Sequence, residues 1–136
     1  MGGVERSEDC ISIYDKDLNI LYWNTSCETQ FSISKSNAIG TNLLILFPAV
    51  KNDYRVDCLQ QAITLEKSFF FSNMPYSTRA GLYHQVIMPI RSPLGIPTQV
   101  LNIVRDARVE ENFITKEDLL NPIQRTRSAF IKRFRS

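Results

Sequence analysis

The sequence lacks the segments that direct a chain into or across a membrane. No apolar run approaches the roughly 20 residues that a membrane-spanning helix needs. The N-terminal stretch, MGGVERSED, has no apolar core of the kind that marks a signal peptide. Arg6 stands where a myristoylation pattern requires Ser or Thr. These absences predict a cytoplasmic setting.

Cysteine and histidine are scarce, which limits the metal and redox chemistry that the chain can support. The three cysteines are Cys10, Cys27 and Cys58, and no two have the Cys-x-x-Cys spacing of a zinc site. An odd count also argues against a disulfide framework. His84 is the only histidine, and the net charge of +2 is too small to predict nucleic-acid binding by the core. We therefore expect no metal site and no nucleic-acid partner for the core domain.

The first third of the chain has the best-defined pattern of elements. Two short runs rich in Ile and aromatic residues, Cys10–Tyr14 and Asn19–Trp23, are typical of strands, and the polar residues between them predict a hairpin turn. Thr25–Glu28 then has the spacing of a helix capping box. Ser34 and Gly40 bracket a second short helix, because Gly readily takes the left-handed conformation that ends one.

The next part of the chain predicts one longer helix and three more strands. The helix is expected over Lys51–Glu66 with Asn52 as its N-cap, and the strands over Ser68–Ser72, Leu82–Ile90 and Thr98–Arg105. Neither group of strands is large enough for an independent sheet. We therefore expect an α+β domain in which one antiparallel sheet carries the helices over one face.

The order of these features resembles the PAS domain, a sensory module of signalling proteins. Members have a strand ending in Asp, a strand ending in Asn, a helix with a central Glu, then a Gly, a "Leu-Phe-Pro"-like end, a later strand-end Pro, a hairpin Gly and a closing Asp. The matching residues here are Asp15, Asn24, Glu28, Gly40, Leu46, Phe47, Pro48, Pro89, Gly95 and Asp106. The resemblance covers residues 10–108. It implies a five-stranded antiparallel sheet in the order 2-1-5-4-3, with helices enclosing a cavity against it.

The aromatic residues predict either a plain core or dimer surface, or a cavity that binds a small apolar or aromatic ligand. Its lining would be largely aromatic, with Tyr54, Cys58 and His84 as candidate polar groups. The full set of candidate cavity residues is Phe31, Phe47, Tyr54, Cys58, Phe70, His84, Val86 and Ile103. Consecutive phenylalanines on a strand point to both faces of a sheet. One sheet face should therefore stay apolar outside the cavity and favour a homodimer.

Four other chemistries depend on particular residues. Light-sensing PAS domains form a flavin–cysteinyl adduct, but Leu43 stands at the position of that Cys, and a leucine cannot add to the ring. Haem-binding members usually place the ligand His on the long helix, and Lys51–Glu66 contains none. Cys58 is a thiol-sensor candidate, although a small core residue is the favoured interpretation. Asp15 and Asp17 are better explained by turn chemistry than by catalysis.

The two ends of the chain differ from the core. Residues 1–9 form a polar N-terminal segment, and residues 109–136 are expected to form a basic amphipathic linker helix that begins near Thr115. Asp106 and Arg108 belong to a closing motif that lacks the Thr of the family. They are the candidates for coupling a signal to the helix.

These features favour a non-enzymatic PAS sensor or interaction module of a cytoplasmic signalling protein. It would relay the binding of a small molecule to an output domain beyond the C-terminal helix, such as a histidine kinase. A ligand-free PAS dimerisation module is the first alternative. A small cone-shaped α+β enzyme of the isomerase or dehydratase kind is the second, and it would need His84 beside a buried carboxylate in a deep pocket.

Overall fold

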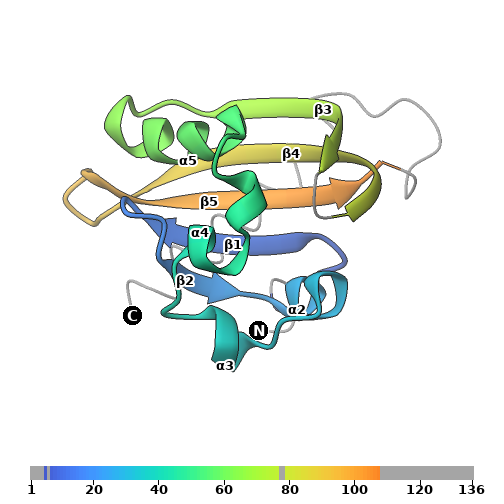
Figure 1. The fold of residues 1–136 in the computed structure, drawn as a ribbon. Coiled ribbons are helices and arrows are strands. Elements are labelled where there is room, and N and C mark those ends of the chain that lie inside the picture. Colours follow the sequence, from blue (N-terminus) through green and yellow to red (C-terminus); the bar gives the residue numbers. More distant parts are fainter. Residues whose placement is uncertain (1–4, 6, 77–78, 108–136) are drawn as a thin grey trace.

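The computed structural model describes Glu5, residues 7–76 and residues 79–107. In this part of the chain a five-stranded antiparallel sheet carries helices on one face (Figure 1). The strands are β1 (Cys10–Asp15), β2 (Ile20–Trp23), β3 (Phe69–Tyr76), β4 (Arg79–Arg91) and β5 (Pro97–Asp106). The helices are α2 (Thr25–Phe31), α3 (Lys35–Ala38), α4 (Leu43–Leu46), the 3₁₀ turn η1 (Pro48–Val50) and α5 (Tyr54–Thr64). The predicted helix over residues 109–136 lies outside the described residues.

The strand order is β2-β1-β5-β4-β3, which confirms the order predicted from the sequence. The first strand pairs with the last in antiparallel register, from Cys10 opposite Val104 to Asp15 opposite Gln99. Figure 1 shows β1 and β5 side by side at the centre of the sheet. None of the described helices is long and apolar enough to cross a membrane.

Helix starts follow the side chains that cap them. Asn24, which the sequence offers as a cap together with Thr25 and Ser26, caps α2, because its side-chain oxygen accepts from the Cys27 N–H. Ser34 caps α3, and Gly40 follows that helix with a φ of +89°, as expected.

The longer helix α5 is shorter than the Lys51–Glu66 span that the sequence predicted. It begins at Tyr54 because the Asp53 carboxylate, not Asn52, accepts from the Arg55 N–H. Val56, Leu59, Ala62 and Ile63 of this helix are buried, whereas Tyr54 at its start and Leu65 just after its end are exposed.

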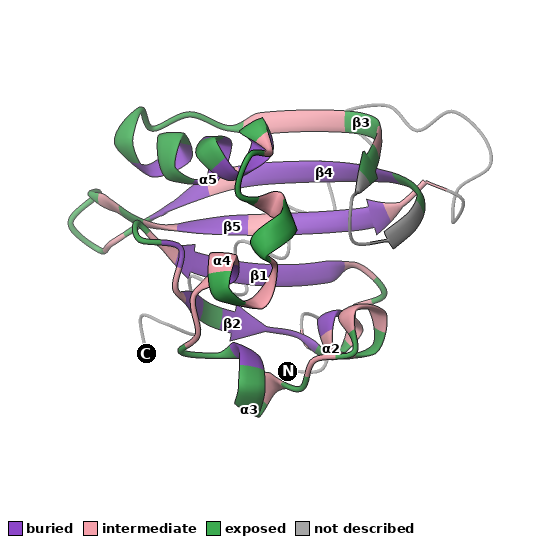
Figure 2. Cartoon of the chain, viewed as in Figure 1, coloured by how far each residue is buried: buried purple, intermediate pink, exposed green. Residues whose placement is uncertain are grey.

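The sheet is buried on both faces, and Figure 2 shows the central strands β1, β4 and β5 mostly as buried residues. The helix-side cluster includes Trp23, Cys27, Leu59, Tyr83, Ile87 and Val104. The outer cluster lies on the other face and consists of Ile11, Ile13, Tyr22, Val86, Ile90, Leu101 and Ile103, with Phe70 and Met88 packed against it. All the apolar residues that the described helices bury belong to the helix-side cluster.

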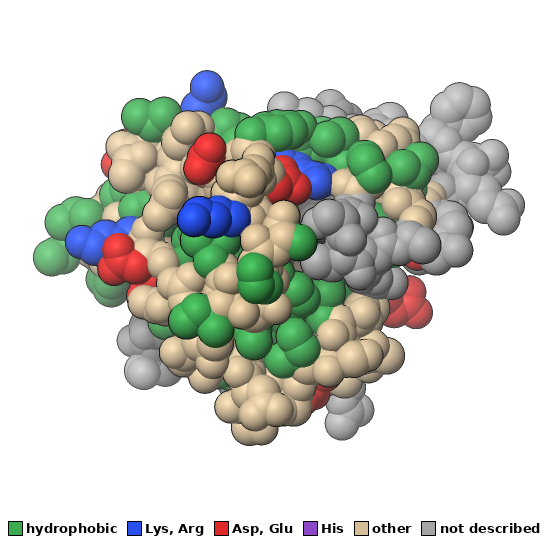
Figure 3. All heavy atoms as spheres, viewed as in Figure 1, with side chains coloured by type: hydrophobic (Ala, Val, Ile, Leu, Met, Phe, Trp, Pro, Cys, Tyr) green, Lys and Arg blue, Asp and Glu red, His purple; other side chains and the backbone are tan. Residues whose placement is uncertain are grey.

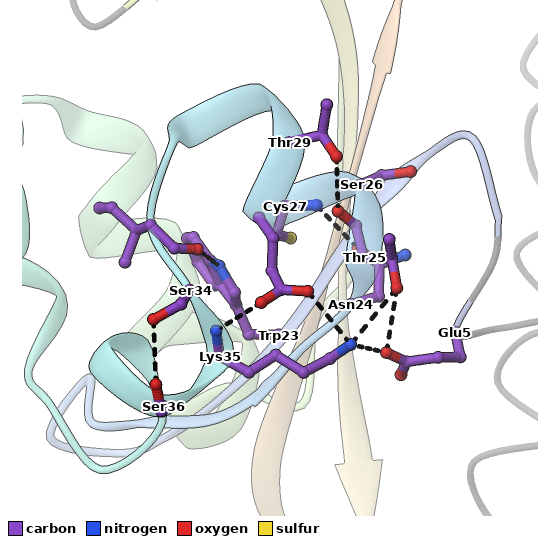
Figure 4. Close-up of polar contacts among 12 residues, drawn as sticks. Glu5, Trp23, Asn24, Thr25, Ser26, Cys27, Thr29, Ser34, Lys35 and Ser36 are labelled. Carbon is purple, nitrogen blue, oxygen red and sulfur yellow. Dashed lines mark hydrogen bonds and ion pairs between the residues drawn. The ribbon is translucent and has the colours of Figure 1, made fainter.

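Asn24 connects β1, β2 and α2 through hydrogen bonds that leave it fully buried. Its Oδ1 accepts from the backbone N–H groups of Ile11 and Cys27, at 3.1 Å each. Its Nδ2 donates to the Asp9 carbonyl at 2.9 Å. Figure 4 shows its position at the start of α2, beside Thr25 and Cys27. The asparagine therefore caps the helix and also fixes its direction relative to the sheet.

Replacing Asn24 should lower the free energy of unfolding more than replacing an ordinary N-cap residue does. Asn24→Ala removes the acceptor of two buried N–H groups, so we expect the free energy of unfolding to fall by about 2–4 kcal/mol. Urea denaturation measures this change. Ser34→Ala is the control, because Ser34 caps the exposed helix α3 and its loss should cost about 1 kcal/mol or less. Equal losses in the two variants would contradict the role given to Asn24.

Candidate functional site

A cavity of about 70 Å³ lies between the helices and the sheet. Strands β1, β2, β4 and β5 supply its floor, and α2, α4, η1 and α5 supply its wall. Figure 3 shows the face of the molecule that the helices cover, where hydrophobic side chains lie among polar side chains and backbone, and charged ones are few and scattered. The cavity is therefore the natural place to look for a binding function.

Aromatic side chains form one wall of the cavity. Trp23 packs against Phe31 with ring centroids 5.6 Å apart, and Phe31 packs against Phe47 at 5.5 Å. The Trp23 Nε1–H donates to the Ile33 carbonyl at 3.0 Å, which fixes the plane of the indole. This wall offers an apolar surface, because the polar atom of the indole is already satisfied.

The sheet contributes a polar floor from the central strands. The Ser12 hydroxyl donates to the Tyr14 hydroxyl at 2.9 Å, and the Gln85 Nε2 donates to Asn102 Oδ1 at 2.8 Å. Asn102 also hydrogen-bonds Tyr14, which joins the two pairs into one chain. Burial raises the pKa of Tyr14 well above its usual value, so the phenol stays neutral at physiological pH. The floor can therefore exchange hydrogen bonds with a ligand without carrying charge.

An ion pair stands at the start of α5. Arg55 Nη2 contacts Asp53 Oδ2 at 2.6 Å, and Arg55 Nε lies 3.0 Å from Asp53 Oδ1. Arg55 Nη2 also donates to the Pro75 carbonyl at 2.9 Å, which ties the helix to β3. Hydrogen bonding to Arg55 lowers the pKa of the Asp53 carboxyl. The two charges therefore satisfy each other beside the cavity.

Two cysteines line the cavity where β1 meets α2. Cys10 and Cys27 are both free and buried. The Cys27 Sγ lies 3.4 Å from the Ile11 carbonyl, and burial, followed by its contact with Cys10, raises the pKa of its thiol. The Cys27 thiol therefore acts as a small neutral side chain. Among the described residues, no three His, Cys, Asp or Glu side chains gather as metal ligands.

The comparison with protein families identifies the fold. The model of the PAS fold matches residues 3–107, which span the whole sheet and the helices over it. The chain belongs to the PAS family. No curated protein has a sequence that matches it.

Solved structures of PAS domains from signalling proteins share this fold. The chain is similar to the sensory box sensor histidine kinase from Vibrio cholerae, with 24% identity over 76% of this chain and 86% of that chain, and a TM-score of 0.65. The PAS domain of BvgS from Bordetella pertussis is 14% identical over 93% of this chain and 92% of that chain, with a TM-score of 0.64. The PAS domain of nitrogen regulation protein NR(II) from Vibrio parahaemolyticus is 18% identical over 76% of this chain and 93% of that chain, with a TM-score of 0.57. Identities this low establish the fold only.

The candidate cavity residues divide between three places in this PAS domain. Phe31 and Phe47 line the cavity, as expected. Cys58 is buried in the helix-side cluster but does not line the cavity. Tyr54 is 55% exposed and packs edge-on against Phe71, with centroids 5.6 Å apart. Tyr54 and Cys58 therefore do not supply the polar groups of this cavity.

The other four candidates lie on the opposite face of the sheet, which corrects their expected placement. Val86 and Ile103 belong to the outer cluster, and Phe70 packs against it. His84 precedes Val86 by two residues, so it points to the same face. There its Nδ1 lies 3.2 Å from the Ser72 Oγ and 3.3 Å from the Asn73 nitrogen. The only histidine therefore lies on β4 beside the irregular pairing of β3 between Phe71 and Met74, away from the cavity.

The polar floor was not among the features predicted from the sequence. Ser12, Tyr14, Gln85 and Asn102 are polar or amphipathic residues at alternate positions of strands that are otherwise apolar. Buried polar groups need hydrogen-bond partners, so several on one face of central strands indicate a polar site. That pattern was present in the sequence and could have identified the floor.

The C-terminal end of the sheet joins the N-terminal end through an ion pair. Arg105 on β5 binds Asp9 in a fork, with Nε to Oδ1 and Nη2 to Oδ2 both at 2.9 Å. Asp106 ends β5 opposite Tyr83. The Ala107 N–H then donates to the Leu82 carbonyl at 3.0 Å. Arg108 lies outside the described residues.

The N-terminal segment is also held at α2 and α3. Lys35 forms ion pairs with Glu5 and Glu28, and its ammonium lies 3.3 Å from the Thr25 hydroxyl (Figure 4). The Glu28 carboxylate accepts from the Lys35 N–H at 2.8 Å. These contacts connect the start of the chain to the helices beside the cavity.

The ion pair at α5 predicts a pH-dependent stability. Asp53→Asn keeps a capping oxygen but removes the charge beside Arg55, so we expect a loss of about 1–3 kcal/mol in the free energy of unfolding at pH 7. In the wild type, the contribution of ionised Asp53 to the free energy of unfolding is fully present above the usual Asp pKa of 3.8. It is lost as the pH falls through the lowered pKa of Asp53 in the folded protein. Urea denaturation from pH 7 to pH 3 should show the two proteins converging.

The control for this prediction is Asp57→Asn. Asp57 is an exposed acid in the first turn of the same helix, so its loss removes only a favourable helix-dipole contact of less than about 1 kcal/mol. A difference between wild type and Asp53→Asn that stays constant from pH 7 to pH 3 would contradict the coupling of Asp53 to Arg55.

Proposed function

We propose that the chain is a sensor module that binds a small molecule in its cavity and passes the change to the rest of a signalling protein. The observation that carries this proposal is the polar floor of the cavity, because it stands on the central strands of the sheet. A ligand that contacts Ser12, Gln85 or Asn102 acts directly on β1, β4 and β5.

The route from the cavity to the chain ends is short. Asn102 in the floor is on β5, three residues before Arg105, whose fork-like ion pair holds Asp9. A shift of β5 therefore reaches both ends of the domain. We propose that Asp106 and the segment that follows it carry this shift to an output domain, such as a histidine kinase, in a cytoplasmic protein.

The size of the cavity supports a small ligand over a large cofactor. A volume of about 70 Å³ holds several waters or a small molecule, and it is too small for a flavin or a haem in the present packing. Leu43 lines the cavity at the position where a flavin adduct would need a cysteine. We therefore propose a sensor that uses neither cofactor.

The enzyme hypothesis has less support than the sensor. It required His84 within a deep pocket, and this residue lies on the face of the sheet opposite the cavity. Asp15 is occupied in its turn, where Oδ1 accepts from the N–H groups of Asp17 and Asn19 at 2.9 and 3.0 Å. We therefore propose a module without catalytic activity of its own.

A ligand-free interaction module is the second candidate function, and the small volume of the cavity favours it. The outer cluster lies on the sheet face opposite the described helices. The residues of this cluster are already buried within one chain, so we propose that the chain segments that flank the domain support a homodimer on this side of the sheet. Analytical ultracentrifugation over a range of concentrations tests this pairing, and a monomer at all of them would exclude it.

Trp23 gives a direct test of ligand binding. It is the only tryptophan, is 2% exposed and lines the cavity, so its emission reports on the cavity alone. We expect the emission of gently purified protein to differ from that of protein unfolded in urea, dialysed and refolded. Adding back the small molecules released in urea should restore the original emission.

The control fills the cavity. In Val56→Phe a larger side chain enters the cavity from α5, so the ligand is excluded and the two preparations should have the same emission. Identical emission in both wild-type preparations, with no effect of the released fraction, would contradict the sensor proposal and favour the ligand-free module.

A further inference from the structure

One side chain in the cavity floor has a buried polar atom for which the described residues supply no partner. Gln85 is 4% exposed, and its Oε1 is buried with no hydrogen-bond partner among the described residues. A buried carbonyl oxygen of this kind is unfavourable unless another molecule supplies a donor. Gln85 also lines the cavity, so that donor can come from a ligand.

The hydrogen-bond chain of the floor fixes the orientation of the Gln85 amide. Its Nε2 donates to Asn102 Oδ1 at 2.8 Å, and the Asn102 amide is itself held by the Tyr14 hydroxyl. Turning the Gln85 amide over would place its oxygen against Asn102 Oδ1, where two acceptors repel each other. The acceptor of Gln85 therefore remains available to the cavity.

The charges around the cavity select an uncharged ligand. Among the described residues that line it, only Asp53 and Arg55 are charged, and each is paired with the other at 2.6 Å. An anion would meet the carbonyl oxygen of Gln85, and a cation would find no free carboxylate. The aromatic wall of Trp23, Phe31 and Phe47 favours a compact apolar body.

We propose that the cavity binds a small uncharged molecule that has an apolar or aromatic body and one N–H or O–H group, and that this group donates to Gln85 Oε1. This inference rests on the proposed function and adds the chemical class of the ligand and the residue that selects it. Gln85 thus determines specificity, and the aromatic wall supplies general affinity.

Pyrrole and furan form a matched pair of probes for this selection. The two rings have the same size, and furan replaces the N–H donor of pyrrole with an acceptor oxygen. Titration of the full chain with each probe, followed by Trp23 emission, should show pyrrole binding about tenfold more tightly than furan. Gln85→Met keeps the length of the side chain but removes the acceptor, so the two probes should bind it equally.

Gln61→Met is the control variant, because Gln61 is exposed on α5 and should leave the tenfold preference unchanged. Equal binding of the two probes to the wild type would overturn this inference and leave the sensor proposal standing, since the cavity would still bind small molecules. Failure of both probes to bind, up to their solubility, would also overturn it. The sensor proposal would then be tested by the Trp23 emission of gently purified and refolded protein, with the small molecules released in urea added back.

Discussion

The antiparallel pairing of β1 with β5 is the constraint on which the rest of the domain depends. It joins the first strand to the last, so the sheet closes around two central strands that are buried on both faces. The same register places Ser12 opposite Asn102, which assembles the polar floor from residues 90 positions apart in the sequence. It also brings Asp9 to Arg105. One pairing therefore builds the cavity floor and connects it to both chain ends.

Burial, more than charge, determines the chemistry of the cavity. The thiol of Cys27 and the phenol of Tyr14 have raised pKa values because both are desolvated. The charges of Asp53 and Arg55 cancel each other at the start of α5. What remains for recognition is hydrogen bonding and apolar contact. Such a site distinguishes ligands by shape and by the position of one donor, because a buried acceptor left unpaired costs about 1–3 kcal/mol.

The sequence predicted the fold more closely than the site, and the reason is the alternation of side chains in strands. His84 and Val86 share one face of β4, and the sequence assigned both to the cavity, although this face is the outer one. Phe70, Val86 and Ile103 pair across three strands and therefore lie on one face. Assigning that face to the cavity misplaced all three residues at once. Alternation shows which residues share a face, but not which face the helices cover. Gln85 and Asn102, polar on buried strands, held the information that decides it.

The most direct test of ligand binding is the mass of the intact protein under native conditions, compared with its mass after denaturation. Gently purified protein should carry a small excess mass, denaturation should remove it, and Val56→Phe should lack it. The released mass should belong to an uncharged molecule small enough for a cavity of about 70 Å³. A native mass equal to that of the polypeptide alone, in protein that is folded and freshly isolated, would contradict the claim that this PAS domain is occupied by the molecule it senses.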